Sequence, residues 1–336
     1  KIPYHIGNIQ MIKAIFGCKN TTKFLIESLS KIIDIDYLIT IDEEKGKKFD
    51  VADYCNLTEI ANKNDISLYN SKTYSLKRRE DIDYIKSLNI DVAFVVGWQR
   101  IVPGEILDSM SIGSFGMHGS SMDLPLGRGR SPMNWSIIEG RKYFYTNLFR
   151  YDSGVDSGDV LDTFKFDITH RDTAETMHFK NTLAMKYLIE RNLDRLLSGD
   201  FTLKKQKDIK PTYYPKRTPD DSLIDWEMGV YELERFIRAV TKPFNGAFSF
   251  LDDKVIIYDS QVFDSSDYGY DDKENGEIVV VFPNGKFLVK CYGGLLLVNV
   301  YQIKNDFIRV GKIFNNGGRN ISYFKRNKFG YFDLEE

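Results

Sequence analysis

Short apolar runs alternate with amphipathic stretches along the N-terminal part of the chain, and this alternation restricts the fold more than any other sequence feature. The run 11–17 (MIKAIFG) precedes a stretch of helical spacing at 21–30, and the run 91–96 (DVAFVV) is closed by Gly97. Strands that alternate with helices pack into a mostly parallel sheet with helices on both faces. We therefore predict a Rossmann-like α/β domain over 11–200. Further strands are predicted at 34–41, 67–69, 114–118 and 143–151, and further helices at 57–64, 78–88, 103–110, 132–139 and 173–197.

The composition changes after this domain. The stretch 201–229 is charged and contains Pro211 and Pro215, which predicts a linker that crosses the surface. A helix is predicted at 230–240, and short strands separated by turn residues follow it. Strands at this spacing favour a small β-barrel, and we predict an OB-like C-terminal domain over 230–320. The predicted strands are 247–250, 254–258, 277–281, 287–291 and 295–301.

The overall composition excludes several classes of protein. The 46 basic and 48 acidic residues give a net charge of −2, so no global electrostatic case exists for a nucleic-acid partner. The three widely spaced cysteines indicate neither a disulfide framework nor a metal cluster, and they fit a cytoplasmic location. We find no apolar run of about 18 residues and expect no membrane span. Residues 1–10 are predicted to be irregular, and the sequence leaves open whether they are native.

Three segments are candidates for a ligand site, because ligands of open parallel sheets bind beyond the carboxyl ends of the strands. The first is Gly17–Asn20, after the first strand; it lacks the glycine spacing of a dinucleotide fingerprint. The second is Gly97–Arg100. The third is 118–132 (HGSSMDLPLGRGRSP), whose glycines and prolines are typical of a shaped loop.

His118 ends a predicted buried strand, and the acidic loop 151–159 (YDSGVDSGD) lies between two strand-like runs. A histidine and an aspartate that meet at the sheet rim form an acid–base pair, in which the carboxylate orients the imidazole. The residues alone leave plainer readings open. His118 fits a structural role, the acidic loop fits a solvated turn, and Arg128 and Arg130 fit surface charges.

The order of these motifs resembles the folate-dependent formyltransferases, a family that includes methionyl-tRNA formyltransferase and enzymes that N-formylate nucleotide-linked amino sugars. The family pattern is Asn-x-His-Gly-Ser, Leu-Pro, Arg-Gly, Pro-x-x-Trp and Asp-x-Gly-x-Asp-x-Gly-Asp. The resemblance extends over about 11–301. The matching segments are His118–Ser120, Leu124–Pro125, Arg128–Trp135, Asp152–Asp159, Pro211–Tyr214, Pro219–Trp226 and Phe236–Ala247.

The resemblance implies a reaction and a set of site residues. His118 would act as general base and oxyanion contact, and Asp156 would orient it. N10-formyltetrahydrofolate would donate the formyl group, and no metal would be required. The folate would contact Trp98, Gln99, Arg100, Ile101, Val102, Tyr151, Asp152 and Gly154. The acceptor would contact Gly17, Lys19, Ser120, Arg128 and Arg130.

The chain departs from the family pattern at two places. The family asparagine two residues before the histidine is Gly116 here, and the following loop is about two residues longer, at 121–123. The asparagine is a donor in the family site, so Ser120, Asn134 or water would have to replace it, or the activity would be weaker. Turnover that survives Gly116→Asn and vanishes in His118→Ala would exclude a non-catalytic protein.

Three functions are open at this point. We favour a nucleotide-linked amino sugar as acceptor, in lipopolysaccharide or surface-glycan biosynthesis, because the chain is slightly acidic and its linker is basic only locally. The alternative is a methionyl-tRNA formyltransferase, which would bind its tRNA with strong salt dependence. The second alternative is a non-catalytic module that binds folate or sugar nucleotides, and Gly116 is its best support. Exposed strands in the second domain are compatible with a homodimer.

Overall fold

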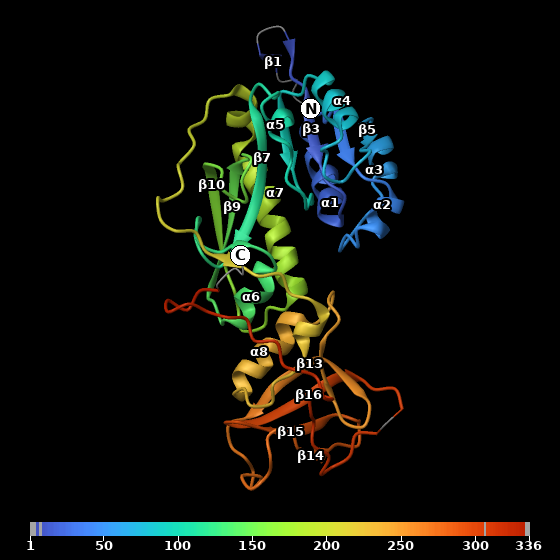
Figure 1. The fold of residues 1–336 in the computed structure, drawn as a ribbon, viewed down its shortest axis with the longest axis vertical. Coiled ribbons are helices and arrows are strands. Elements are labelled where there is room, and N and C mark those ends of the chain that lie inside the picture. The colour runs from blue at the N-terminus through green and yellow to red at the C-terminus, as the bar shows by residue number, and fades with distance from the viewer. Residues whose placement is uncertain (1–4, 7–8, 306, 333–336) are drawn as a thin grey trace. The chain divides into compact units, whose positions relative to one another are not determined.

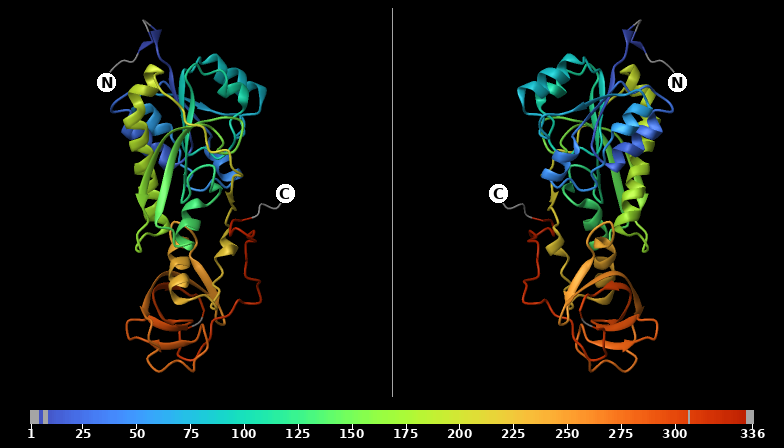
Figure 2. Two further views of the ribbon diagram at one scale, coloured as in Figure 1. Left: turned by 90° about the vertical axis from the view of Figure 1, so that its left-hand side faces the viewer. Right: turned by 90° about the vertical axis from the view of Figure 1, so that its right-hand side faces the viewer.

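The computed structural model describes residues 5–6, 9–305 and 307–332, and these fall into two compact units (Figures 1 and 2). The first unit contains the residues up to Gly119 together with Tyr145–Lys165 and Asn181–Lys210. The second contains Ser120–Phe144, Phe166–Lys180 and the residues from Pro211 onward. The predicted division at 200 and 230 stays a prediction, because it follows the sequence whereas the compact units interleave along it.

A seven-stranded sheet runs in the order β10-β9-β7-β6-β3-β4-β5 among the described residues. The pairs β3–β4, β4–β5, β3–β6 and β6–β7 are all parallel. This mostly parallel sheet confirms the predicted α/β fold. Its strands are β3 (Lys13–Phe16), β4 (Tyr37–Thr40), β5 (Ser67–Asn70), β6 (Val92–Val95), β7 (Gly113–Ser120), β9 (Tyr143–Arg150) and β10 (Val160–Asp167).

Hydrophobic cores cover both faces of this sheet. Along β3, Ile15 belongs to one core, whereas Ala14 and Phe16 belong to the other. This alternation explains why the strand sequences are apolar throughout. Helices α1 (Asn20–Leu29) and α7 (Ala174–Ser198) contribute to the first core, and α4 (Arg79–Ser87) and α5 (Gly104–Leu107) to the second. The remaining helices of this part are α2 (Glu43–Lys48) and α3 (Thr58–Lys63).

The second unit contains a five-stranded antiparallel sheet in the order β12-β13-β16-β15-β14. Its strands are β12 (Ala247–Phe250), β13 (Lys254–Asp264), β14 (Ile278–Val281), β15 (Phe287–Cys291) and β16 (Gly294–Gln302). Two helices belong to the same unit, α6 (Pro132–Ile138) and α8 (Val230–Val240), together with a short 3-10 helix at Pro219–Ser222. The predicted β-rich domain is therefore confirmed.

The segment around Phe314 closes this sheet into a barrel. Asn315 exchanges two backbone hydrogen bonds with Phe250 of β12, and Ile278 of β14 donates to the Lys312 carbonyl over 2.8 Å. The edge strands β12 and β14 thus share one neighbouring segment, which pairs with Phe250 at the end of β12 and with Ile278 at the start of β14. We predicted a small β-barrel but not the segment that closes it. We also did not predict α2, the parallel pair of β8 (Arg128–Gly129) with β11 (Tyr213–Tyr214), or the antiparallel pair of β1 (His5–Ile6) with β2 (Ile9–Gln10). The last pair lies where the sequence suggested irregular structure.

Replacing Phe314 with alanine should lower the free energy of unfolding of the second unit by about 3–5 kcal/mol, because it empties a buried aromatic site. The Phe314 ring is 4% exposed and stacks on Trp226 at a centroid distance of 4.9 Å. Urea denaturation followed by tryptophan fluorescence measures the loss. Tyr292→Ala is the control, because that aromatic side chain is 70% exposed, and it should change stability by less than about 1 kcal/mol. Equal losses in the two variants would contradict the closure by Phe314.

Candidate active site

The carboxyl ends of β3, β6 and β7 form the rim where the candidate site lies. Gly17 follows β3, and a Cβ there would come within 2.1 Å of the Val96 carbonyl oxygen, so only glycine allows this approach of the two strand ends. The backbone nitrogen of Cys18 donates to the Gly97 carbonyl over 3.4 Å. Lys19 is the N-cap residue of α1. The first two predicted segments therefore lie together, while ligand contacts of Gly17 and Lys19 stay a prediction.

The segment Trp98–Val102 is divided between core and solvent. Trp98 and Val102 are buried, and the Trp98 ring packs edge-on against Tyr74 at 4.9 Å. Gln99, Arg100 and Ile101 are exposed. The Trp98 ring packs into the core, so the exposed side chains of this predicted folate-binding segment are those of 99–101, and folate contacts here stay a prediction.

The structure brings His118 and Asp156 together. His118 lies on β7, is 8% exposed, and places Nδ1 3.3 Å from the Asp156 Oδ2 atom. The Asp156 side chain is 18% exposed, so the pair is largely shielded but still open to solvent on the carboxylate side. A carboxylate at Nδ1 fixes the orientation of the ring and stabilises its protonated form. This is the geometry of an oriented acid–base pair.

The loop that carries Asp156 is held in shape by its own polar groups. Asp156 has a φ of +50°, a left-handed conformation that aspartate tolerates better than most residues. The Gln206 side-chain amide donates to the carbonyls of Asp156 and Gly158, at 2.8 Å each. Asp152 accepts from the Gly154 backbone nitrogen and the Ser157 hydroxyl. Sequence reasoning missed Gln206, because a glutamine in a charged linker gives no signal of this contact.

Gly116 leaves room for the Tyr151 ring. A Cβ at Gly116 would lie 2.6 Å from Cζ and 2.9 Å from Oη of Tyr151. Tyr151 follows β9, and its backbone nitrogen donates to the Ser114 carbonyl of β7 over 2.8 Å. An asparagine at position 116 would therefore collide with an aromatic ring, so Gly116→Asn alone does not separate a catalytic protein from a non-catalytic one.

The other candidates for the missing asparagine have partners of their own. The Asn134 amide is buried and donates to the Ala239 carbonyl over 2.7 Å, which joins α6 to α8. The Ser120 hydroxyl accepts from the Met122 backbone nitrogen at 3.3 Å. Asn134 is thus a structural residue, and Ser120 shapes the start of its own loop.

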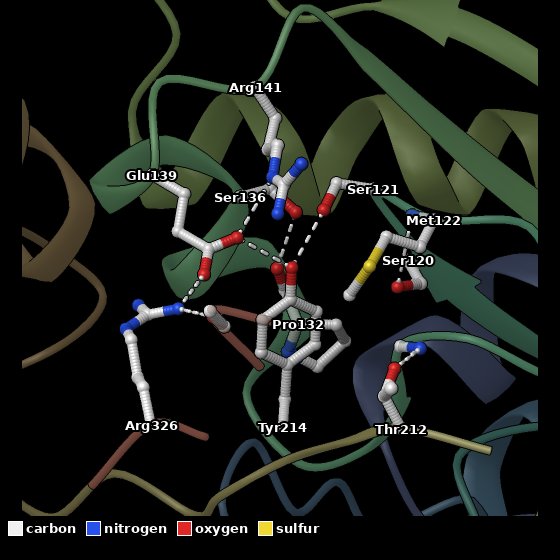
Figure 3. Close-up of polar contacts among 12 residues, drawn as sticks. Ser120, Ser121, Met122, Pro132, Ser136, Glu139, Arg141, Thr212, Tyr214 and Arg326 are labelled. Atoms are coloured by element: carbon white, nitrogen blue, oxygen red, sulfur yellow. Dashed lines mark hydrogen bonds and ion pairs between the residues drawn. The ribbon is translucent and has the colours of Figure 1, made fainter. Parts of the chain in front are cut away.

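A hydrogen-bond network braces the loop 120–131 (Figure 3). The Tyr214 hydroxyl lies 2.9 Å from the Ser121 hydroxyl and donates to Glu139 over 2.8 Å. Glu139 also forms ion pairs with Arg141 and Arg326, both at 2.9 Å. The network thereby holds Ser121, the first residue of the longer stretch 121–123. Within this loop Arg128 is buried and Arg130 is exposed, so the two guanidinium groups have different surroundings.

Other sites are not evident in the described residues. No group of three or more His, Cys, Asp or Glu side chains in this part of the chain is arranged to hold a metal. None of the described helices combines the length and apolar character needed to cross a bilayer. An open depression in the second unit, lined by Lys242, Phe244 and Tyr258 among others, contains none of the predicted site residues.

The sheet, the contact between His118 and Asp156 at its rim and the barrel define an α/β protein with a candidate site at the sheet rim and an additional β domain. Models of protein families identify it further. Residues 45–190 match the formyl transferase family, and residues 216–317 match the formyl transferase C-terminal domain. The chain belongs to the formyl transferase family, as its motifs predict.

Individual relatives agree with this assignment. Methionyl-tRNA formyltransferase of Clostridium novyi is 30% identical over 84% of this chain and 90% of its own. The bifunctional polymyxin resistance protein ArnA of Wigglesworthia glossinidia brevipalpis is 36% identical over 54% of this chain, but the match spans only 28% of that relative. An N-formyltransferase of Helicobacter canadensis, solved with folinic acid and dTDP-3-aminofucose, has a TM-score of 0.61 and 19% identity, covering 90% of this chain and all of its own. That likeness shows a shared fold.

Proposed function

We propose that this chain transfers the formyl group of N10-formyltetrahydrofolate to the amino group of a nucleotide-linked amino sugar. The contact between His118 and Asp156 at the sheet rim carries the proposal. It supplies the proton-accepting group that an attacking amine needs, in the family in which formyl transfer is the defining chemistry. The same contact argues against a non-catalytic folate- or sugar-binding module, because a binding protein has no need of an oriented imidazole.

In the proposed reaction, the uncharged amine nitrogen attacks the formyl carbon and forms a new C–N bond. The carbonyl electron pair moves to oxygen, and His118 accepts the proton that the amine loses. Asp156 faces Nδ1, so Nε2 is the nitrogen that takes this proton. The bond to N10 then breaks as the imidazolium returns the proton to N10. Holding both substrates in place contributes a further part of the rate, because the reaction becomes effectively unimolecular.

The acceptor class rests on charge and on one arginine. A net charge of −2 gives weak attraction for the many phosphates of a tRNA, whereas a sugar nucleotide carries only a diphosphate. Arg130 is exposed on the loop that follows β7, and a guanidinium fork suits paired phosphate oxygens. The crystallised Helicobacter canadensis relative was solved with such a nucleotide sugar. We accordingly propose a role in surface-glycan biosynthesis in the cytoplasm.

Methionyl-tRNA is the second candidate acceptor. Its support is the relatives named methionyl-tRNA formyltransferase, which match this chain at 30% identity over most of their length. Two properties separate the candidates. The KM for tRNA should rise steeply with salt, whereas a sugar nucleotide should compete with the free nucleotide diphosphate.

The test is a turnover screen of the purified protein with N10-formyltetrahydrofolate, read by mass spectrometry of the acceptor. The panel contains dTDP-3-aminofucose, other nucleotide-linked amino sugars and charged methionyl-tRNA. We expect one formyl group on at least one sugar nucleotide and none on the tRNA. Formylation of the tRNA alone would replace the proposed acceptor, and formylation of neither class would overturn the proposed function.

A further inference from the structure

The Tyr151 side chain occupies the space directly above Gly116 on β7. Its ring atoms would lie 2.6–2.7 Å from a Cβ at Gly116, and its hydroxyl oxygen 2.9 Å from it. The ring also packs edge-on against Phe149 at a centroid distance of 5.3 Å, which fixes its position. The Tyr151 ring therefore fills the space that a side chain at position 116 would occupy.

This position places the hydroxyl on the same face of β7 as the His118 imidazole. Gly116 and His118 are two residues apart on one strand, and side chains at that spacing point to the same side of a sheet. Asp156, which contacts His118, also acts on Tyr151 through its charge. Tyr151, His118 and Asp156 thus belong to one cluster.

The Tyr151 hydroxyl is available as a hydrogen-bond donor. Among the described residues, burial and the charge of Asp156 act on this hydroxyl, and no hydrogen bond does. Burial, and then the negative charge of Asp156, raise the pKa of the Tyr151 phenol above its ordinary value. The phenol therefore keeps its proton over the whole working pH range, as a donor must.

We propose that the Tyr151 hydroxyl donates a hydrogen bond to the formyl oxygen as that oxygen becomes negatively charged, an inference that rests on the proposed formyl transfer. When the amine attacks, the C=O electron pair moves onto oxygen, and the phenol O–H stabilises this charge without giving up its proton. The charge disappears again when the carbonyl reforms and the bond to N10 breaks. Donors aimed at a developing oxyanion contribute strongly to acyl transfer. In this chain Tyr151 and Gly116 together would take the place of an amide side chain at 116.

The first test compares Tyr151→Phe with the wild type, using N10-formyltetrahydrofolate and whichever of dTDP-3-aminofucose or methionyl-tRNA the wild type formylates. Loss of the hydroxyl should lower kcat by about 10²-fold, as for other oxyanion donors. KM for both substrates and Kd for folinic acid should stay within twofold of wild type, because the ring remains. The melting temperature should stay within a few degrees for the same reason. Tyr145→Phe is the control; it removes a hydroxyl from β9 roughly 20 Å along the strand.

The second test exchanges the two side chains. Gly116→Asn alone should lose activity and thermal stability, because the new Cβ collides with the ring. Adding Tyr151→Ala removes the collision and leaves the asparagine amide as donor. The double variant should recover kcat by at least about tenfold over Tyr151→Ala alone.

The outcomes separate the inference from the proposed function. A wild-type enzyme that formylates neither acceptor would overturn both. An active wild type with an equally active Tyr151→Phe would overturn the role of the hydroxyl and leave formyl transfer intact. A double variant no more active than Tyr151→Ala would contradict the equivalence of the two donors. Loss in Tyr151→Phe at unchanged KM, together with recovery in the double variant, would support the assignment.

Discussion

Replacing His118 with asparagine should lower kcat for formyl transfer by about 10²- to 10⁴-fold, the usual contribution of a positioned general base. The substitution removes the only group that we assign to the amine proton and keeps a polar side chain of similar size. KM should change little, because His118 accepts a proton in the transition state and is not assigned to hold the bound substrate. Steady-state kinetics with saturating N10-formyltetrahydrofolate measure the effect.

His170→Asn is the matched control for this substitution, since His170 is exposed at the turn before α7. It should leave kcat within twofold of wild type. A His118→Asn enzyme with similar kcat would show that the amine loses its proton to solvent or to another group.

Replacing Asp156 with asparagine should lower kcat by about 10²- to 10³-fold, because the charge that stabilises the protonated imidazole is lost. Asparagine keeps the shape of the side chain, and the carbonyls of 156 and 158 remain bound to Gln206, so the loop should stay folded. The enzyme should therefore keep its melting temperature and its Kd for folinic acid. Kinetics combined with a thermal denaturation curve separate the loss of charge from loss of the loop.

The matched control is Asp200→Asn, which removes an exposed carboxylate from the same unit and should have no effect on kcat. A full loss of activity accompanied by a lower melting temperature in Asp156→Asn would assign Asp156 a structural role instead.

The parts of this fold that could be predicted are the strands and helices that have a local sequence pattern, such as an apolar run or helical spacing. The DVAFVV run became β6 with every residue of Val92–Val95 buried, and helical spacing located α1, α4, α7 and α8 to within a few residues. His118 and Asp156 were predictable for a different reason. Each lies in a short motif with a specific order of residues, so the pair could be proposed although the two are distant in the chain.

The features that escaped prediction depend on contacts between distant backbone groups. The closure of the barrel at 312–315 uses backbone hydrogen bonds to Phe250 and Ile278, and backbone groups are the same in every residue. The strands β8 and β11 have two residues each, too few for an alternating apolar pattern. The packing of Tyr151 over Gly116 required the register of two strands that pattern reasoning does not supply. The glycine at position 116, where the family has asparagine, could therefore be explained only once the Tyr151 ring was known to occupy that space.

The most direct test of the central claim is a double-mutant cycle on kcat with His118→Asn and Asp156→Asn. If Asp156 acts through His118, as the 3.3 Å contact indicates, the double variant should be no slower than His118→Asn alone, within about twofold. Losses that multiply in the double variant would show that the two side chains act independently, and the paired proton-transfer site would have to be abandoned.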